Sequence, residues 1–431
     1  MNTVIKKAGV ILLLLAVLSA SWIAVVSNQK NDIERQDRLA GEADAYIEDK
    51  IYVYAVPLLE EAAGIESDRT YGLQMKLKDT YLKLGDYKKY YELLQNLIVT
   101  EKAEPDIYLE TANYYFNTRK YKEALGILLK GFEKTGDEEL YKYYEENRYR
   151  ISKAGGRYQY ISEIMNGAAI VKNNGKWGVV SLTGGQMIPC VYDKVSTYDN
   201  GAVIVSKDGE IYTVNSQNQR IALLKTETQD FKNLSESVSA LLINGKWIRC
   251  TPGFLTGTTE FEDIGILSNG YMAVKSNGKW GVQTKNGEYL IPAEYEEIKM
   301  DELGRCRFQE TVFVKKDGAY YLYNGDGMQN TAYDDAYPFG ASYYAAVKKN
   351  GKWGFIDNTG REVLPFEWDG ALSFGMHLAA VKTGDKWGYI NQSGNIVIEP
   401  AYDEAKSFSG GCAPVFDGTN WMFIILEEYK N

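Results

Sequence analysis

The sequence predicts a multidomain α and β chain, with a transmembrane helix at the N-terminus, a helical segment after it and an all-β domain at the end. Three observations lead to this fold class. Positions 8–26 carry no charge, positions 36–155 are rich in helix formers without strand alternation, and positions 157–431 consist of short β-branched and aromatic runs between glycine-containing turns. A chain of 431 residues is also too long for one ordinary core.

The first element is the uncharged run from Ala8 to Val26, which follows Lys6 and Lys7. Its length is close to the roughly 20 residues that cross a bilayer as a helix. The apolar run continues past the small residues 19–21, near which a cleaved signal peptide would end. We therefore expect an uncleaved signal anchor, with a cleaved signal peptide as the alternative. The lysines predict that residues 1–30 form a cytoplasmic tip and anchor, and that the domains after them lie outside the cytoplasm.

The second element, residues 36–155, contains an internal repeat. The segment from Leu84 to Lys89 recurs 34 residues later as the segment from Thr118 to Glu123. The second copy resembles the tetratricopeptide repeat, whose large and small packing positions match Tyr108, Ala112, Tyr115, Tyr121, Ala124, Leu128 and Gly131. In the copy before it, Lys78 and Tyr90 replace small residues. Residues 38–64 resemble a degenerate earlier copy, and residues 137–150 a terminal capping helix.

The tetratricopeptide resemblance implies helix pairs that stack and present a concave groove. In that family the first helix of each pair lines the groove. By this carry-over the candidate ligand contacts are Asp79, Lys83, Asn113 and Asn117. The alternative interpretation is that these four are solvated polar residues of amphipathic helices.

The third element, residues 157–431, repeats a core of the form Asn-Gly-Lys-Trp-Gly. One aromatic residue marks the core of each of eight units, and successive aromatics stand 33 to 40 residues apart. These aromatics are Trp177, Tyr212, Trp247, Trp280, Tyr320, Trp353, Trp387 and Trp421. The regular recurrence predicts a repeat architecture in which every unit has the same strand layout.

Each unit predicts a meander of short strands. In one unit, Tyr344 to Lys349 form a strand, and Asn350-Gly351 supplies the positive φ angles of a tight hairpin. Lys352 to Asp357 form the returning strand, and a second turn follows at Gly360. Pro365 then marks the end or edge of the next strand, because proline has no backbone donor.

This pattern resembles the WG-repeat family of bacterial proteins over about 270 residues. Such a meander must bury its edges, either in a closed, propeller-like ring or in an open β-superhelix, and we favour the ring. The domain begins with residues 157–164, which resemble the stretch after a proline in other units, and it ends on Trp421 to Leu426. We therefore expect this last strand to join strands from the 157–180 region and close the ring.

Composition argues against several function classes. The net charge of −10 disfavours nucleic acid as a partner, since phosphate binding needs concentrated Lys and Arg. The four cysteines are far apart and show no zinc-site spacing, although a disulfide stays open. His377 is the only histidine, which disfavours a catalytic triad. We expect no catalytic, cofactor-binding or metal-binding residues.

Two functions remain open. The first is a non-enzymatic binding or scaffold protein outside the cytoplasm, whose repeat surfaces bind a protein, a peptide or a cell-wall glycan. The alternative is a glycan-acting enzyme or enzyme subunit that uses carboxylates of the β domain, for which Glu296-Glu297 and Asp334-Asp335 are candidates. Adjacent strand residues point to opposite faces, so solvated acids are the simpler interpretation of both pairs. Carboxylates from different units that converge in one pocket would favour the enzyme.

Overall fold

The structure is a computed structural model, and it divides into two compact units, Met1–Asn147 and Arg148–Asn431, which are described separately. The residues described are 27, 29–223, 227–235, 238–251, 255–306, 311–325, 327–340 and 342–429. The expected anchor at residues 8–26 lies outside these residues. Within the described part of the chain, we find no helix that combines the length and the apolar character needed to cross a membrane.

In the described part of the first unit, helices alternate with short turns. Residues 29–48 form a helix, and six further helices follow it. They are α2 (Tyr52–Ala63), α3 (Thr70–Leu84), α4 (Tyr87–Leu97), α5 (Pro105–Asn117), α6 (Tyr121–Thr135) and α7 (Glu138–Asn147). Helices α4 and α6 both begin at the tyrosine of the 34-residue sequence repeat. Gly85, with φ of 81°, ends α3, and the Asp86 carboxylate accepts the Lys89 amide hydrogen at the start of α4.

Packing in the helical unit explains why the earlier repeat departs from the small-residue pattern. Lys78 is buried, and its Nζ lies 2.7 Å from Glu110 Oε1. The Tyr90 hydroxyl donates to Glu110 Oε2 at 2.6 Å. In the later repeat the positions 34 residues further on are the fully buried small residues Ala112 and Ala124. In the earlier repeat, contacts of Lys78 and Tyr90 with Glu110 thus take the place of two small packing residues.

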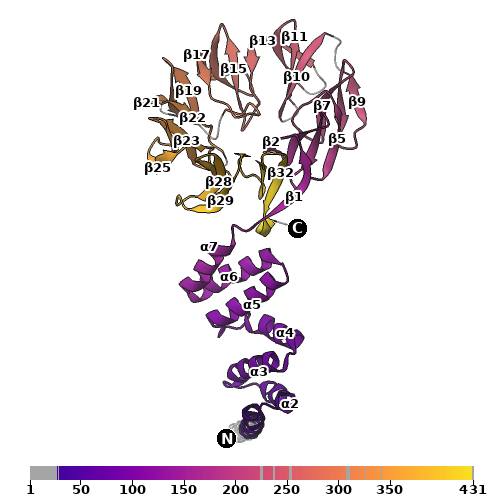
Figure 1. The fold of residues 1–431 in the computed structure, drawn as a ribbon, viewed down its shortest axis with the longest axis vertical. Helices are drawn as coiled ribbons and strands as arrows, with labels where there is room; N and C mark the ends of the chain where they lie inside the picture. Colours follow the sequence, from indigo (N-terminus) through magenta and orange to yellow (C-terminus); the bar gives the residue numbers. More distant parts are fainter. Residues whose placement is uncertain are drawn as a thin grey trace, which may run out of the picture. The chain divides into compact units, whose positions relative to one another are not determined.

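The second unit consists of eight four-stranded antiparallel sheets that follow one another around a ring (Figure 1). We number these blades 1 to 8. Blade 1 contains β2 (Tyr160–Met165), β3 (Ala168–Asn173), β4 (Lys176–Ser181) and β5 (Gln186–Tyr192), and blade 2 contains β6 (Lys194–Val195), β7 (Ala202–Lys207), β8 (Glu210–Asn215) and β9 (Arg220–Leu223). Blade 3 contains β10 (Thr228–Ser235), β11 (Val238–Ile243), β12 (Lys246–Thr251) and β13 (Leu255–Phe261), and blade 4 contains β14 (Asp263–Ile264), β15 (Tyr271–Ser276), β16 (Lys279–Thr284) and β17 (Tyr289–Tyr295).

Blades 5 to 8 repeat this layout, with one strand of the last blade taken from the start of the unit. Blade 5 contains β18 (Glu297–Ile298), β19 (Val312–Lys316), β20 (Ala319–Asn324) and β21 (Gly327–Tyr333), and blade 6 contains β22 (Asp335–Ala336), β23 (Tyr344–Lys349), β24 (Lys352–Asp357) and β25 (Glu362–Trp368). Blade 7 contains β26 (Gly370–Ala371), β27 (Leu378–Thr383), β28 (Lys386–Asn391) and β29 (Ile396–Tyr402), and blade 8 contains β30 (Glu404–Ala405), β31 (Cys412–Phe416), β32 (Trp421–Leu426) and β1 (Ile151–Tyr158). A short 3-10 helix, Glu427–Tyr429, follows β32.

Pairing of β1 with β32 closes the ring. The two strands are antiparallel, with Ile151 opposite Leu426 and Ala154 opposite Phe423. Figure 1 shows them side by side near the C-terminus. The fold is therefore an eight-bladed β-propeller, and the open superhelix is excluded.

Two sequence-based boundaries need correction. Helix α7 ends at Asn147, so the helical segment does not continue to residue 155. The closing strand is Ile151–Tyr158, most of which precedes the 157–180 region in which we expected it. This strand lies at the outer edge of blade 8, where much of it is exposed and needs few apolar residues. It also contains Gly155 at φ of 74° and a register shift, which hide strand alternation in the sequence.

In blades 1, 4, 6 and 7, a Trp-Gly pair faces a bulge in the outer strand. In blade 4, Trp280 lies opposite Tyr295, and Val282 lies opposite Ile291, so three residues of β17 span the position of Gly281. A Cβ on Gly281 would lie 2.5 Å from the Ile291 carbonyl oxygen. Trp280 is only 8% exposed and packs in one cluster with the first strands of blade 5. The tryptophan therefore serves packing between units.

Candidate binding site at the centre of the propeller

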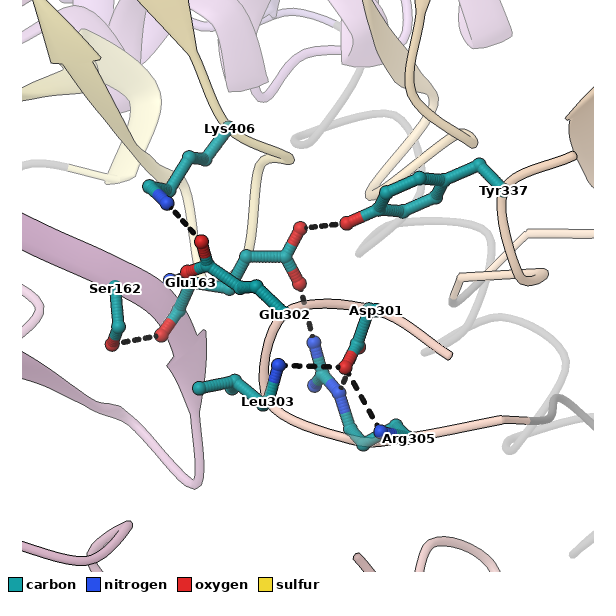
Figure 2. Close-up of polar contacts among 8 residues, drawn as sticks. All are labelled: Ser162, Glu163, Asp301, Glu302, Leu303, Arg305, Tyr337 and Lys406. Carbon is teal, nitrogen blue, oxygen red and sulfur yellow. Dashed lines mark hydrogen bonds and ion pairs between the residues drawn. The ribbon is translucent and has the colours of Figure 1, made fainter. Parts of the chain in front are cut away.

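One link between strands is longer than the others and reaches across the ring. Residues 299–311 connect β18 to β19, whereas only residues 372–377 connect the corresponding strands β26 and β27. The long link belongs to blade 5, and its Arg305 contacts Glu163 of blade 1. In an eight-bladed ring these blades stand opposite each other, so the contact lies near the centre. Figure 2 shows the link and the side chains that meet there.

A tight turn from Asp301 to Arg305 gives the long link its local shape. The Asp301 amide donates to the Arg305 carbonyl oxygen at 2.9 Å, and Gly304 takes a φ of 92°. The Asp301 carboxylate accepts from the Leu303 and Arg305 amides and, at 2.5 Å, from Arg305 Nε. The Gly304 carbonyl oxygen accepts the Ile266 amide at 2.8 Å, which ties the turn to blade 4. These contacts hold the shape of the turn independently of the contact between Arg305 and Glu163.

Glu163 lies at the middle of the polar cluster. Glu163 is only 5% exposed. One of its carboxylate oxygens lies 2.7 Å from Arg305 Nη2, and the other accepts a hydrogen bond from the Tyr337 hydroxyl. A register shift in β2 frees the Glu163 amide from the strand ladder, and this amide donates to Glu302. Glu302 in turn pairs with Lys406 of blade 8. Side chains from blades 1, 5, 6 and 8 thus form one connected network (Figure 2).

The positive charge near Glu163 is too small to keep its carboxylate ionised as readily as in water. Burial, followed by the nearby Asp301 carboxylate, raises the pKa of Glu163 to about 7, even though Arg305 and the Tyr337 hydroxyl act in the opposite direction. Burial and the Glu163 carboxylate raise the pKa of Tyr337 well above its ordinary value. Tyr337 is therefore a neutral donor, and Glu163 changes its charge near neutral pH.

A cavity of about 310 Å³ opens beside the cluster. Glu163, Asp301, Arg305 and Tyr337 line one part of it. The remaining lining is mostly small or aromatic and comes from blades 1, 4, 6, 7 and 8: Ile164, Ser268, Asn269, Pro338, Phe339, Gly340, Ser373, Gly375, Ser407, Phe408 and Ser409. Its volume suits a small polar ligand or a single side chain of a partner.

The cluster bears directly on the enzyme alternative, because carboxylates of different units do converge here. Glu163 of blade 1 and Asp301 of blade 5 both bind Arg305. Asp301, however, makes the same turn contacts as Asp357, whose turn with Arg361 joins two outer strands. The presence of Asp301 in the cluster is therefore explained by the turn that its carboxylate holds.

The two acid pairs singled out in the sequence have structural partners instead. Glu296 and Asp334 accept the amides of Gly318 and Gly351 and so cap the hairpin of the next blade. Asp335 lies 2.6 Å from Lys299 Nζ, and Glu297 lies 3.8 Å from Lys315 Nζ. None of these four acids lines the central cavity.

The four groove residues of the helical unit are only partly brought together. Asn113 lines a cavity of about 500 Å³ between α5 and α7, and it accepts the Tyr143 hydroxyl at 3.0 Å. Asp79 is exposed beside Lys78, at 3.0 Å, and Lys83 and Asn117 are exposed near the ends of their helices. Their role as ligand contacts stays a prediction.

Other chemically distinctive residues occupy ordinary positions. His377 is exposed in a turn with φ of 76°. Cys190, Cys250, Cys306 and Cys412 are not joined to one another by disulfides. Over the described ranges, no cluster of three or more His, Cys, Asp and Glu side chains could hold a metal ion.

Sequence reasoning missed the residues of the central cluster, but one signal pointed to them. The spacing from Trp280 to Tyr320 is 40 residues, the largest between neighbouring units. The additional residues form the link that carries Asp301 and Arg305. An insertion that interrupts a regular repeat often maps to a binding face.

Comparison with solved structures finds distant likenesses. One is a crystal structure of the eukaryotic initiation factor, with 11% identity over 64% of this chain and 87% of that chain and a TM-score of 0.41. Others are YCF48 bound to D1 peptide, with 8% identity over 65% and 97% and a TM-score of 0.34, and YCF48 from Cyanidioschyzon merolae, with 10% identity over 65% and 99% and a TM-score of 0.34. These values are too low to support a conclusion about function. No curated protein matches the chain significantly.

Comparison with known families agrees with the fold. The family model described as "WG containing repeat" matches seven times, at residues 156–177, 177–210, 259–280, 280–310, 332–353, 353–387 and 387–421. The matched segments begin or end on the core tryptophans that pack between blades. With a helical unit before these repeats and an eight-bladed propeller built from them, the chain belongs to the WG-repeat family.

Proposed function

We propose that this chain is a membrane-anchored, non-enzymatic binding or scaffold protein that works outside the cytoplasm. Residues 8–26 would anchor it, with the N-terminus inside and both repeat units outside. Its partner would be a protein, a peptide or a cell-wall glycan. One observation carries the proposal: the central cavity is lined by several blades and bordered by an ion network whose carboxylates are already paired.

The occupied carboxylates favour binding over glycan hydrolysis. A glycosidase needs one protonated acid and one ionised carboxylate that face the same bond. Both oxygens of Glu163 already accept hydrogen bonds, and Asp301 is held by its own turn. The raised pKa of Glu163 fits an acid, but the second carboxylate is not free to act as its partner.

The helical unit offers a second surface for the same role. The cavity between α5 and α7 is bordered by Asp106, Asp137, Glu139 and Glu146, with Lys142 as the only cation among its lining residues. This excess of acid favours a basic segment of a partner. The scaffold would then hold one partner at the helices and another at the propeller.

Topology gives the first test. A tag placed after Asn431 should be cleaved by protease added outside intact cells, and the protein should stay in the membrane with its N-terminus intact. The reason is the uncharged run at residues 8–26 behind two lysines. Protection of the tag would refute the proposed location, and release of a shortened soluble form would favour a cleaved signal peptide.

Binding gives the second test. A soluble fragment of residues 31–431 should be retained by purified cell wall or by envelope proteins, and Arg305→Ala should weaken retention at the propeller. Glu288→Gln, at an exposed position outside both cavities, serves as the control and should leave retention unchanged. If neither envelope fraction retains the fragment, or if the fragment hydrolyses cell-wall glycan, the binding function is wrong.

A further inference from the structure

We propose that the central cavity of the propeller binds a primary ammonium group, which sits against Glu163 and the serine hydroxyls that line the same cavity. The group could belong to a free amine or to a lysine or N-terminus of a peptide, since the chemistry is the same. This inference rests on the proposed binding function only in that the cavity takes a ligand.

The charges around Glu163 make this part of the cavity wall attractive to a cation. The groups that face Glu163 come from four elements of the ring: Tyr160 on β2, Asp301, Glu302 and Arg305 on the 299–311 link, Tyr337 after β22, and Lys406 after β30. Lys406 is taken by Glu302, and Arg305 is shared between Glu163 and Asp301. Among the described residues, three carboxylates therefore face two cations, and one further positive charge would balance these five groups.

The lining also provides the hydrogen bonds that an ammonium group needs. A primary ammonium has three N–H donors and no acceptor. Each oxygen of Glu163 can accept a second hydrogen bond besides the one from Arg305 or Tyr337. Ser268, Ser407 and Ser409 line the other part of the cavity as further acceptors. A volume of about 310 Å³ admits an amino-acid-sized group.

Alternative ligands fit this lining less well. A neutral polyol could use the serine hydroxyls but would leave the extra carboxylate uncompensated. An anion would meet Glu163 and Asp301 on the wall that carries Arg305. Phe339 and Phe408 are buried in the remaining wall and suit the apolar stem behind an ammonium group.

Protonation of Glu163 should compete with the ammonium group. Glu163 has a pKa of about 7, so a proton occupies the carboxylate at pH 6 and is mostly absent at pH 8. Because only the ionised carboxylate attracts a cation, binding should be about tenfold tighter at pH 8 than at pH 6. At pH 6 binding should also release close to one proton.

The test is calorimetric titration of the full chain in detergent with 1,5-diaminopentane and, in a second arm, with a blocked Gly-Lys-Gly peptide. Controls are 1,5-pentanediol and glutarate, which keep the chain length without the positive charge. We expect either amine to bind and the controls to bind at least tenfold more weakly. Tighter binding of the peptide than of the diamine would assign the ammonium to a protein partner, and the reverse order to a small amine.

Variants separate the site from nonspecific attraction. Glu163→Gln should weaken amine binding at pH 8 at least tenfold and remove its pH dependence, whereas Glu288→Gln, at an exposed turn, should change neither. Should Glu163→Gln fail to fold, Ser407→Val tests the serine part of the lining, and buffers of different ionisation enthalpy measure proton release by the unmodified chain. Equal binding of diol and diamine, tighter binding of glutarate, or pH-independent binding without proton release would each overturn the inference.

The two proposals fail in different ways. Loss of envelope binding with intact amine binding would refute the scaffold function and leave the ammonium site. Intact envelope binding without any amine binding would refute the ammonium site alone.

Discussion

At the scale of single residues, two acids of the propeller show how strongly the surroundings decide the charge of a carboxylate. Asp369 lies 2.6 Å from Lys352 Nζ of its own repeat and accepts the Gly384 amide of the next blade at 2.8 Å. The Lys352 ammonium holds the pKa of Asp369 below its ordinary value. For Glu163, in contrast, burial and neighbouring carboxylates outweigh its arginine and raise its pKa. Asp369 thus joins two blades, whereas Glu163 lies in the central cluster.

Glu163 gives a pH-dependent prediction for stability. Its folded pKa of about 7 exceeds the ordinary value of 4.5, so the native state holds a proton that the unfolded chain has lost between these pH values. Its contribution to the free energy of unfolding, of about 3 kcal/mol, is full below pH 4.5 and disappears as the pH rises through 7. The tryptophans lie in the propeller apart from Trp22, so urea titration followed by their fluorescence measures this unit.

Glu163→Gln should lack this pH dependence, because an amide does not titrate. Between pH 5 and pH 8 the variant should therefore become more stable relative to the unmodified chain. The exposed Glu288→Gln serves as the matched control and should follow the unmodified chain. A difference between Glu163→Gln and the unmodified chain that stays constant over this range would contradict the assignment.

At the scale of elements, the Trp-Gly motif, the proline and the following aromatic together form the bulge of the outer strand. In blade 1 a Cβ on Gly178 would lie 2.5 Å from the Ile188 carbonyl oxygen, and Trp177 lies opposite Tyr192. The residues between Ile188 and Tyr192 bulge over the glycine, and Pro189 is tolerated there because the outer strand has no further neighbour. The glycine is needed for space rather than for an unusual φ angle.

Two glycines of the same hairpin should therefore respond differently to alanine. Gly281→Ala places a Cβ against backbone atoms of the bulge, at 2.5 Å from the nearest, and should destabilise the propeller by about 3 kcal/mol. Gly278→Ala meets no atom within 4 Å and should cost only about 1 kcal/mol, from its φ of 75°. The measurement is the same urea titration. Equal losses at the two positions would show that the bulge yields to the added methyl group.

At the scale of the whole propeller, stability depends on the contact between its two chain ends. Strand β32 is buried along its full length, with β31 on one side and β1 on the other. Without β1, the apolar edge of β32 would be open for pairing with another chain. Ring closure is thus a property of the complete unit from Arg148 onward, and a fragment that begins at residue 157 would lack most of the closing strand.

Truncation tests the closure directly. A fragment of residues 148–431 should be monomeric and should unfold cooperatively, whereas a fragment of residues 159–431 should be less stable and should aggregate through the edge of β32. Light scattering and the urea titration check both statements. A monomeric 159–431 fragment with the stability of the longer one would show that β1 does not hold the ring.

The sequence by itself determined the helical unit, the eight repeats and the strand layout within each blade, because these depend on local spacing. Asn350-Gly351, for example, takes the positive φ angles of 53° and 80° that its hairpin requires. Only the tertiary structure decided which strand closes the ring and where the polar cavity lies. Strand β1 shows little apolar alternation because much of it faces solvent at the edge of a blade. Glu163 and Arg305 are 142 positions apart and meet only because blades 1 and 5 face each other across the closed ring.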